Sequence, residues 1–182
     1  MIEVKVGGLI PDRKTRSHVL LLKLPGSAKY LPVWIGENEA SAIDMAVRKQ
    51  GFERPLTHDL LKSVIDGLGA EVSRVVITTI QDSTFFARIL LTRNHEVVSI
   101  DARPSDSIAL AVRVGCPIFL TEELVASQAN NLYEFEEGPD TAAGADSSAE
   151  VDALLRSMGS PPDDALEPDL FDAEDDDDED DS

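Results

Sequence analysis

The sequence is poor in cysteine and in aromatic residues: its 182 residues include one cysteine, and aromatic side chains make up 5%. A single cysteine excludes an intrachain disulfide and a zinc site built from cysteines. Cys116 lies in an apolar stretch directly before Pro117, which is typical of a small buried hydrophobic residue and not of a nucleophile.

Long apolar runs are also missing. The longest one, from Val19 to Leu24, is interrupted by Lys23 and is far shorter than the ~20 residues that a transmembrane helix needs. The first residues lack the basic-then-apolar profile of a secretory signal. We therefore expect a cytoplasmic protein with no membrane partner.

Positive charge is almost absent from the C-terminal part. Residues 1–132 carry fifteen Lys or Arg and fifteen Asp or Glu, whereas residues 133–182 carry one Arg against twenty acidic residues. The second segment has few large apolar side chains, so it cannot bury enough surface to offset its ordering entropy. We expect one folded domain over residues 1–132 and a disordered acidic tail over residues 133–182. A short helix is predicted at 147–158, where Ser147 and Glu150 fit a capping box, provided that a partner surface covers it.

Period-two alternation and turn residues predict the strands, and three-and-four spacing predicts the helices. We expect strands at residues 2–6, 17–24, 30–35, 72–80, 84–91, 97–100 and 117–120. The near-continuous apolar run at 17–24 is suited to a strand covered on both faces. Helices are expected between Gly36 and Gly51 and after Thr57, Ser105 and Thr121, which are good N-caps. Strand pairs joined by turns, with helices between the groups, favour an α+β fold with a compact mixed β-sheet and packed helices.

Charged residues gather where three predicted helices begin. They are Glu37 and Glu39 at the first helix, Arg54, His58 and Asp59 at the second, and Asp101, Arg103 and Asp106 at the third. Carboxylates, a histidine and arginines of this kind could hold a divalent metal against a phosphodiester. Acidic residues are also common in the first turns of helices that have no catalytic role. Arg103, which lies between two aspartates, could form an ion pair that is purely structural. The spacing alone leaves both interpretations open.

Four strings carry a family resemblance: LPVWIGENEA at 31–40, RPLTHDLL at 54–61, TFFA at 84–87 and DARPSDSIAL at 101–110. In this order, they resemble the bifunctional nuclease domain family over roughly residues 1–127. The resemblance implies a compact α+β fold and cleavage of both DNA and RNA, in a bacterial or plastid setting.

The implied activity narrows the mechanism. DNA has no 2′-hydroxyl that could attack the phosphate, so water is the simplest nucleophile for both substrates. The simplest way to activate that water is a divalent metal such as Mg or Mn. On that basis we predict Asp101, Asp106 and Glu37 as metal ligands, with His58, Asp101 and Asp106 catalytic. Arg54 and Arg103 are the predicted phosphate-binding residues.

Two other functions stay open beside a nuclease hydrolysing DNA and RNA. The chain could be a non-catalytic regulatory or scaffolding module, in which the acidic tail recruits a protein partner. It could also be an oligomer that binds a small ligand between subunits, because the apolar strands and Trp34 permit a homo-oligomer. Besides recruiting a partner, the tail could fold over a basic face and screen it from nucleic acid, or simply aid solubility.

Overall fold

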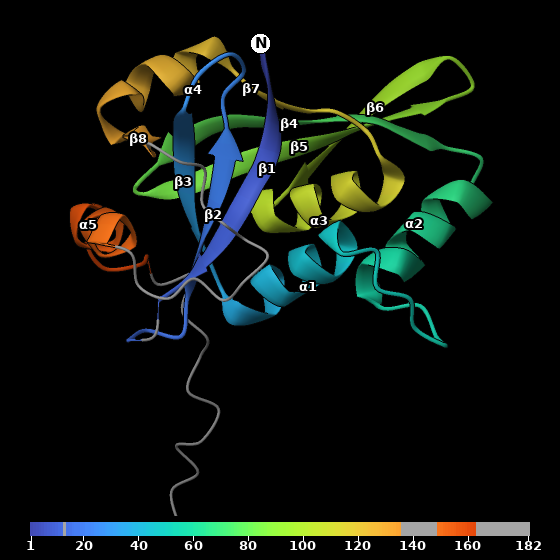
Figure 1. Cartoon of the computed structure of the whole chain (residues 1–182). Coiled ribbons are helices and arrows are strands. Elements are labelled where there is room, and N and C mark those ends of the chain that lie inside the picture. Colours follow the sequence, from blue (N-terminus) through green and yellow to red (C-terminus); the bar gives the residue numbers. More distant parts are fainter. Residues whose placement is uncertain (13, 136–148, 163–182) are drawn as a thin grey trace, which may run out of the picture.

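The computed structural model describes residues 1–12, 14–135 and 149–162. An eight-stranded sheet forms the centre of the molecule, in the strand order β6-β5-β4-β7-β1-β2-β3-β8, and helices cover it (Figure 1). The strands are β1 (Ile2–Pro11), β2 (His18–Lys23), β3 (Lys29–Ile35), β4 (Glu71–Gln81), β5 (Thr84–Arg93), β6 (Glu96–Ala102), β7 (Ile118–Leu120) and β8 (Tyr133–Glu134). The helices are α1 (Glu37–Val47), α2 (Thr57–Gly67), α3 (Pro104–Val114), α4 (Glu122–Ser127), the 3₁₀ turn η1 (Ala129–Asn131) and α5 (Ala149–Met158). The predicted α+β class is confirmed.

The sheet contains two antiparallel three-stranded units. β1, β2 and β3 form one unit and are followed by α1, while β4, β5 and β6 form the other and are followed by α3. β7 joins the units, because it pairs parallel to β4 and antiparallel to β1. α1 and α3 pack against each other on one side of the sheet. Each of these helices begins directly after the third strand of its unit.

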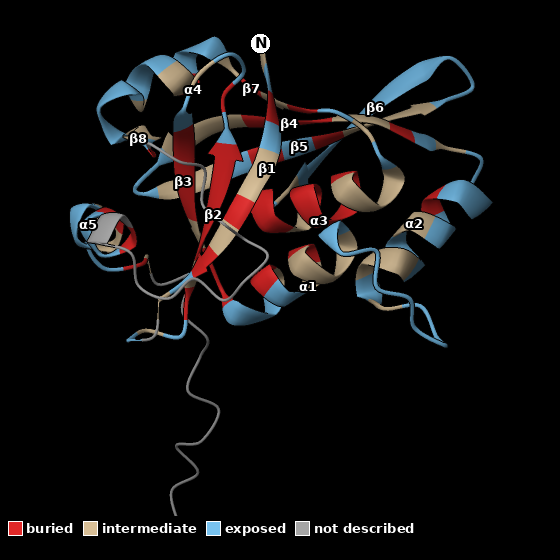
Figure 2. Ribbon diagram, viewed as in Figure 1, coloured by how far each residue is buried: buried red, intermediate tan, exposed pale blue. Residues whose placement is uncertain are grey.

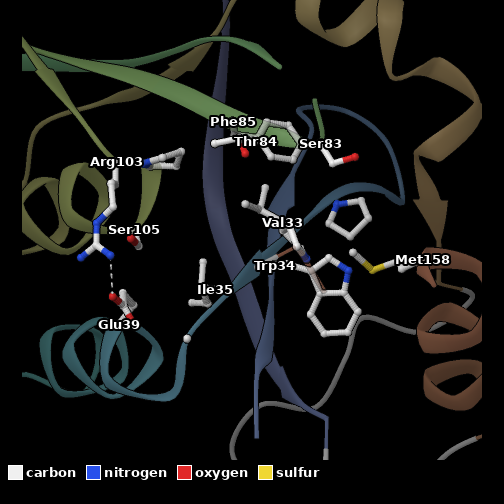
Figure 3. Close-up of a pocket in the computed structure, with 14 residues that line it drawn as sticks. Val33, Trp34, Ile35, Glu39, Ser83, Thr84, Phe85, Arg103, Ser105 and Met158 are labelled. Atoms are coloured by element: carbon white, nitrogen blue, oxygen red, sulfur yellow. Dashed lines mark ion pairs between the residues drawn. The ribbon is translucent and has the colours of Figure 1, made fainter. Parts of the chain in front are cut away.

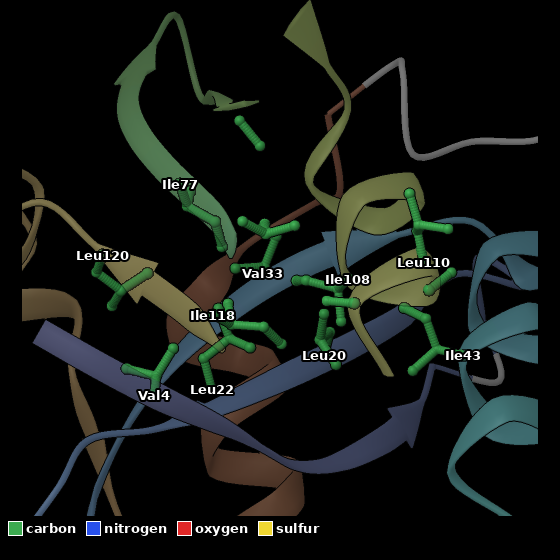
Figure 4. Close-up of a cluster of buried hydrophobic side chains, with 14 of the residues drawn as sticks. Val4, Leu20, Leu22, Val33, Ile43, Ile77, Ile108, Leu110, Ile118 and Leu120 are labelled. Carbon is green, nitrogen blue, oxygen red and sulfur yellow. The ribbon is translucent and has the colours of Figure 1, made fainter. Parts of the chain in front are cut away.

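Strand β2 is covered on both faces, as its apolar run predicts. Val19, Leu20, Leu21 and Leu22 are all fully buried, and buried residues follow the strand along its length (Figure 2). Leu20 and Leu22 belong to the main core between the sheet and helices α1 and α3 (Figure 4). Val19 and Leu21 belong to a second core on the opposite face.

This second core is completed by residues beyond position 132. Val151 and Leu154 of α5 pack with Phe135 against β1, β2 and β3, and Leu154 is 1% exposed. β8 adds a strand at the sheet edge, with Tyr133 in register with Tyr30. The surface that the helix predicted at 147–158 requires is therefore this face of the sheet. The rest of the acidic segment, residues 136–148 and 163–182, lies outside the described residues.

Two of the predicted N-caps are wrong. α2 begins at Thr57 itself, after Leu56, whose backbone N–H donates to Asp59 Oδ2 at 3.0 Å. α3 has Arg103 as its N-cap, because Pro104 takes the first helical position, where a missing N–H costs nothing. Ser105 therefore lies inside the first turn. Thr121 is confirmed as the cap of α4: its side chain accepts from the N–H of Leu124 at 3.2 Å.

None of the helices within residues 1–12, 14–135 and 149–162 is both long and apolar enough to cross a bilayer.

Candidate active site at three helix N-termini

Side chains from the first turns of α1, α2 and α3 meet in one place. His58 Nε2 of α2 lies 3.2 Å from Asp106 Oδ1 of α3. Arg103 donates from Nε to Asp106 Oδ2 at 2.8 Å, and its Nη1 pairs with Glu39 Oε1 of α1 at 2.9 Å. We call Glu39, His58, Arg103 and Asp106 the junction cluster. All four were candidate polar positions in the sequence, and the fold brings them into contact.

Asp106 is the electrostatic centre of the junction cluster. The hydrogen bond with His58, together with the hydrogen bond and charge of Arg103, lowers the pKa of Asp106 to about 2, although partial burial opposes the shift. The hydrogen bond with Asp106 in turn raises the pKa of Arg103. At neutral pH the carboxylate is ionised and can only accept hydrogen bonds, so Nε2 of His58 carries the proton. In the neutral form of the ring, Nδ1 of His58 is then the nitrogen whose lone pair can accept a proton.

A second ion pair supports the helix that carries His58. Arg113, 8% exposed in its side chain, donates from Nε to Asp59 Oδ1 at 2.7 Å. Its Nη1 donates to the carbonyl oxygens of Ala42 and Ala109, each at 3.0 Å. Burial alone would raise the pKa of Asp59, but the hydrogen bond from Arg113 contributes to a net lowering. This arginine thus ties α1, α2 and α3 together and positions the turn that holds His58.

Sequence reasoning missed Arg113. The one available signal was an arginine within the otherwise apolar stretch from Ile108 to Val114. A buried arginine in such a stretch needs an acidic partner or carbonyl groups.

Asp101 lies away from the junction cluster. It belongs to β6, in register with Arg88 of β5, while the next pair is Ala102 with Ala87. Ala87 is fully buried in the core beneath the helices. Because successive strand residues point to opposite faces, Asp101 lies on the face turned away from α3. The structure therefore does not bring Asp101 to His58 and Asp106.

Glu37 and Arg54 are also separate from the cluster. Glu37 is exposed in the first turn of α1, where its charge acts on His18; burial lowers the pKa of that histidine and Glu37 partly offsets the effect. Arg54 is exposed in the segment before α2 and forms no ion pair or hydrogen bond within the described part of the chain.

The predicted metal ligands do not form a metal-binding group. Across residues 1–12, 14–135 and 149–162, no three His, Cys, Asp or Glu side chains are placed so that they could hold a metal ion. Asp106 contributes both carboxylate oxygens to contacts with His58 and Arg103. Mg²⁺ needs oxygen ligands at about 2.1 Å in octahedral geometry. The donor set found here does not fit a Mg²⁺ or Mn²⁺ ion held by Asp101, Asp106 and Glu37.

A cavity of about 90 Å³ lies beside the junction cluster (Figure 3). Arg103 and Glu39 line one end of it, joined by their ion pair. The opposite end is formed by Trp34 of β3 and Met158 of α5. Two members of the junction cluster, Glu39 and Arg103, therefore face a hollow in the surface, whereas His58 and Asp106 lie beside it and do not line it.

Fold and site together define a mixed α+β domain in which a histidine, an ionised carboxylate and an exposed arginine meet at helix N-termini. These groups suit the binding and hydrolysis of phosphate esters. Comparison with known families gives a more specific answer. Residues 20–132 match the bifunctional nuclease domain, and the chain belongs to that family.

Individual relatives extend the comparison. Uncharacterized protein Rv1829 of Mycobacterium tuberculosis is 42% identical over 168 residues, which cover 90% of this chain and 98% of that protein. Bifunctional nuclease 1 of Arabidopsis thaliana is 30% identical over 131 residues, covering 70% of this chain and 40% of the plant protein. Bifunctional nuclease 2 of Oryza sativa subsp. japonica is 31% identical over 124 residues, which cover 66% of this chain and 38% of the rice protein. This chain thus spans between about one third and two fifths of the plant nucleases it matches.

Proposed function

We propose that the protein is a nuclease that hydrolyses phosphodiester bonds of DNA and RNA at the junction cluster. The observation that supports this proposal most directly is the contact of His58 with Asp106, which also forms an ion pair with Arg103. The family membership supports the same reaction, since the plant relatives are named bifunctional nucleases. A cytoplasmic location stays a prediction.

Each residue of the cluster has a role in this proposal. His58 accepts a proton from the attacking water at Nδ1, and the water oxygen forms a bond to phosphorus as the ester P–O bond breaks. The proton then passes from His58 to the leaving alkoxide. Asp106 holds the histidine ring in the tautomer that leaves Nδ1 free. Arg103, 58% exposed in its side chain, offers its guanidinium to the phosphate oxygens.

The proposed steps do not run through a metal ion, because the cluster has no matching ligand set. Dependence on Mg²⁺ or Mn²⁺ is tested directly by cleavage with and without EDTA. Activity that survives chelation supports the histidine mechanism. Activity that stops and returns with added Mn²⁺ would show that the metal is held with the help of substrate phosphates.

The decisive experiment compares two histidine variants of the full chain. His58→Asn removes the proposed base, whereas His95→Asn changes an exposed histidine in the β5–β6 turn, where positive φ suits asparagine. We expect His58→Asn to lose cleavage of single-stranded DNA and RNA by at least 100-fold, with His95→Asn at the level of the parent. Equal cleavage by both variants would refute the role of His58.

A non-catalytic oligomeric module is the second candidate, and the edge strand β6 favours it. Val97, Val98 and Ile100 of this strand are 63%, 43% and 42% exposed, and β6 is the last strand of the sheet. Exposed apolar edge strands pair readily with another chain. Sedimentation of the parent and of Val97→Lys tests this: an oligomer lost in the variant, with no cleavage by either protein, would favour the module over the nuclease.

A further inference from the structure

The cavity beside the junction cluster has two chemically different ends. It lies among the end of β3, the first turns of α1 and α3, the β4–β5 turn and the end of α5. Figure 3 shows Arg103, Ser105 and Glu39 gathered at one end, and Trp34 with Met158 at the other. Phe85 lies between these ends along the wall formed by β5. A ligand that fills it needs a polar part and a flat or apolar part.

Two hydrogen-bonding groups of the cavity wall have no partner among the described residues. Ser105 is 6% exposed, and its hydroxyl makes no hydrogen bond there. The indole Nε1 of Trp34 is buried and also lacks a partner. Buried polar groups are nearly always satisfied in folded proteins. The buried indole nitrogen of Trp34, together with the accessible hydroxyl of Ser105 in the same cavity, therefore favours a ligand with hydrogen-bond acceptors.

The polar end favours an anionic group. α1 and α3 each begin at this cavity, at Gly36 and Arg103, and neither has a side chain that caps its first N–H groups. Unpaired N–H groups of a helix N-terminus attract phosphate. The Glu39 carboxylate also lines this end, but its Oε1 is already paired with Arg103 Nη1 at 2.9 Å.

We propose that this cavity binds one unpaired nucleotide of a single-stranded nucleic acid. The base lies between Trp34 and Phe85, and its phosphate lies at Ser105 and the start of α3, next to Arg103. The assignment rests on the proposed nuclease function and adds a substrate class to it. The cavity is small, at about 90 Å³, and unstacked bases bind protein by stacking on aromatic side chains.

Trp34 makes the proposal directly measurable, because it is the one tryptophan of the 182-residue chain. The full chain is titrated with AMP, with inorganic phosphate, and with a single-stranded DNA octamer and its duplex, and tryptophan fluorescence is recorded. We expect a saturable change with AMP and with the single strand, and a binding constant for the duplex at least tenfold weaker. No change with AMP and the octamer, or equal binding of duplex and single strand, would overturn the proposal.

Variants separate this subsite from the catalytic step. Phe85→Leu and Ser105→Ala are expected to weaken octamer binding about tenfold, whereas Phe52→Leu, at an exposed site outside the cavity, keeps the parent's affinity.

His58→Asn keeps the fluorescence response and loses cleavage. If His58→Asn cleaves normally while the binding pattern holds, the proposed catalytic role fails and the subsite stands. If the octamer is displaced by a synthetic peptide of residues 163–182 but AMP does not bind, the cavity is a site for an acidic peptide and the proposal is refuted.

Discussion

His58 and Asp106 are 48 positions apart in the chain, and their side chains meet at 3.2 Å across the first turns of α2 and α3. The aspartate is held on its other side by Arg103 at 2.8 Å. A carboxylate placed between a histidine and an arginine stays ionised, and it can orient the ring while the arginine remains available to a phosphate. This relationship, more than any single residue, supports hydrolysis at the junction cluster.

The variant Asp106→Asn tests whether catalysis depends on the contact between His58 and Asp106 or on the carboxylate of Asp101. The amide can donate as well as accept, so it no longer enforces the His58 tautomer, and we expect kcat/KM to fall by about 100-fold. Asp101→Asn is the comparison, since Asp101 lies on the far face of the sheet. Steady-state cleavage of a labelled oligonucleotide measures both. A loss confined to Asp101→Asn would favour the metal site predicted from the sequence over the junction cluster.

Acid should destabilise the protein through Asp106. Its pKa in the folded state is about 2, below the usual value near 3.9 in the unfolded chain. A depressed folded pKa contributes stability that is complete above about pH 5 and is lost as the pH falls towards 2. Urea unfolding midpoints at pH 6, 4 and 3 measure the effect. Asp106→Asn should show a flatter dependence over this range, and an identical slope would contradict the assignment.

Arg113→Met should lower the free energy of unfolding by roughly 2–4 kcal/mol. The substitution leaves the Ala42 and Ala109 carbonyls without their donor and Asp59 without its ion-pair partner. Denaturant unfolding measures the loss. Arg48→Met is the matched control, because Arg48 pairs with Asp44 at an exposed site and such pairs contribute about 0.5 kcal/mol.

Leu154→Ala should show that α5 is part of the folded core. Leu154 is 1% exposed among residues of β1, β2 and β3, and truncation of a buried leucine costs about 2–5 kcal/mol. Leu68→Ala serves as the control, because Leu68 is 59% exposed and surface substitutions usually stay within about 0.5 kcal/mol. Equal unfolding midpoints for the two variants would contradict the packing of α5 against the sheet.

Removal of residues 163–182 should tighten binding of nucleic acid at low salt. This segment carries thirteen acidic and no basic residues, so its deletion lessens repulsion of phosphate groups. Fluorescence anisotropy of a labelled oligonucleotide at 20 mM and 300 mM salt measures the difference. The gain should shrink at the higher salt because the charges are screened. The same affinity for both chains at low salt would eliminate the tail as a screen.

The sequence by itself determined most of the local structure. Alternation at 2–6 and the apolar run at 17–24 predicted β1 and β2, and the burial of β2 on both faces followed from that run. The helices predicted from the sequence pattern placed His58, Arg103 and Asp106 at helix N-termini. These features depend on residues close in the chain, whose side chains report directly on the exposure of their own strand or helix.

The tertiary structure decided which of these residues meet. Asp101 and Asp106 are five positions apart, yet the alternation of strand β6 turns Asp101 to the far face, while Asp106 joins His58 from a different helix. The docking of α5 depends on Val19 and Leu21 more than a hundred residues earlier. Arg113 finds Asp59 only because α2 and α3 pack together. Such contacts depend on how the chain crosses the sheet, and no local pattern records that path.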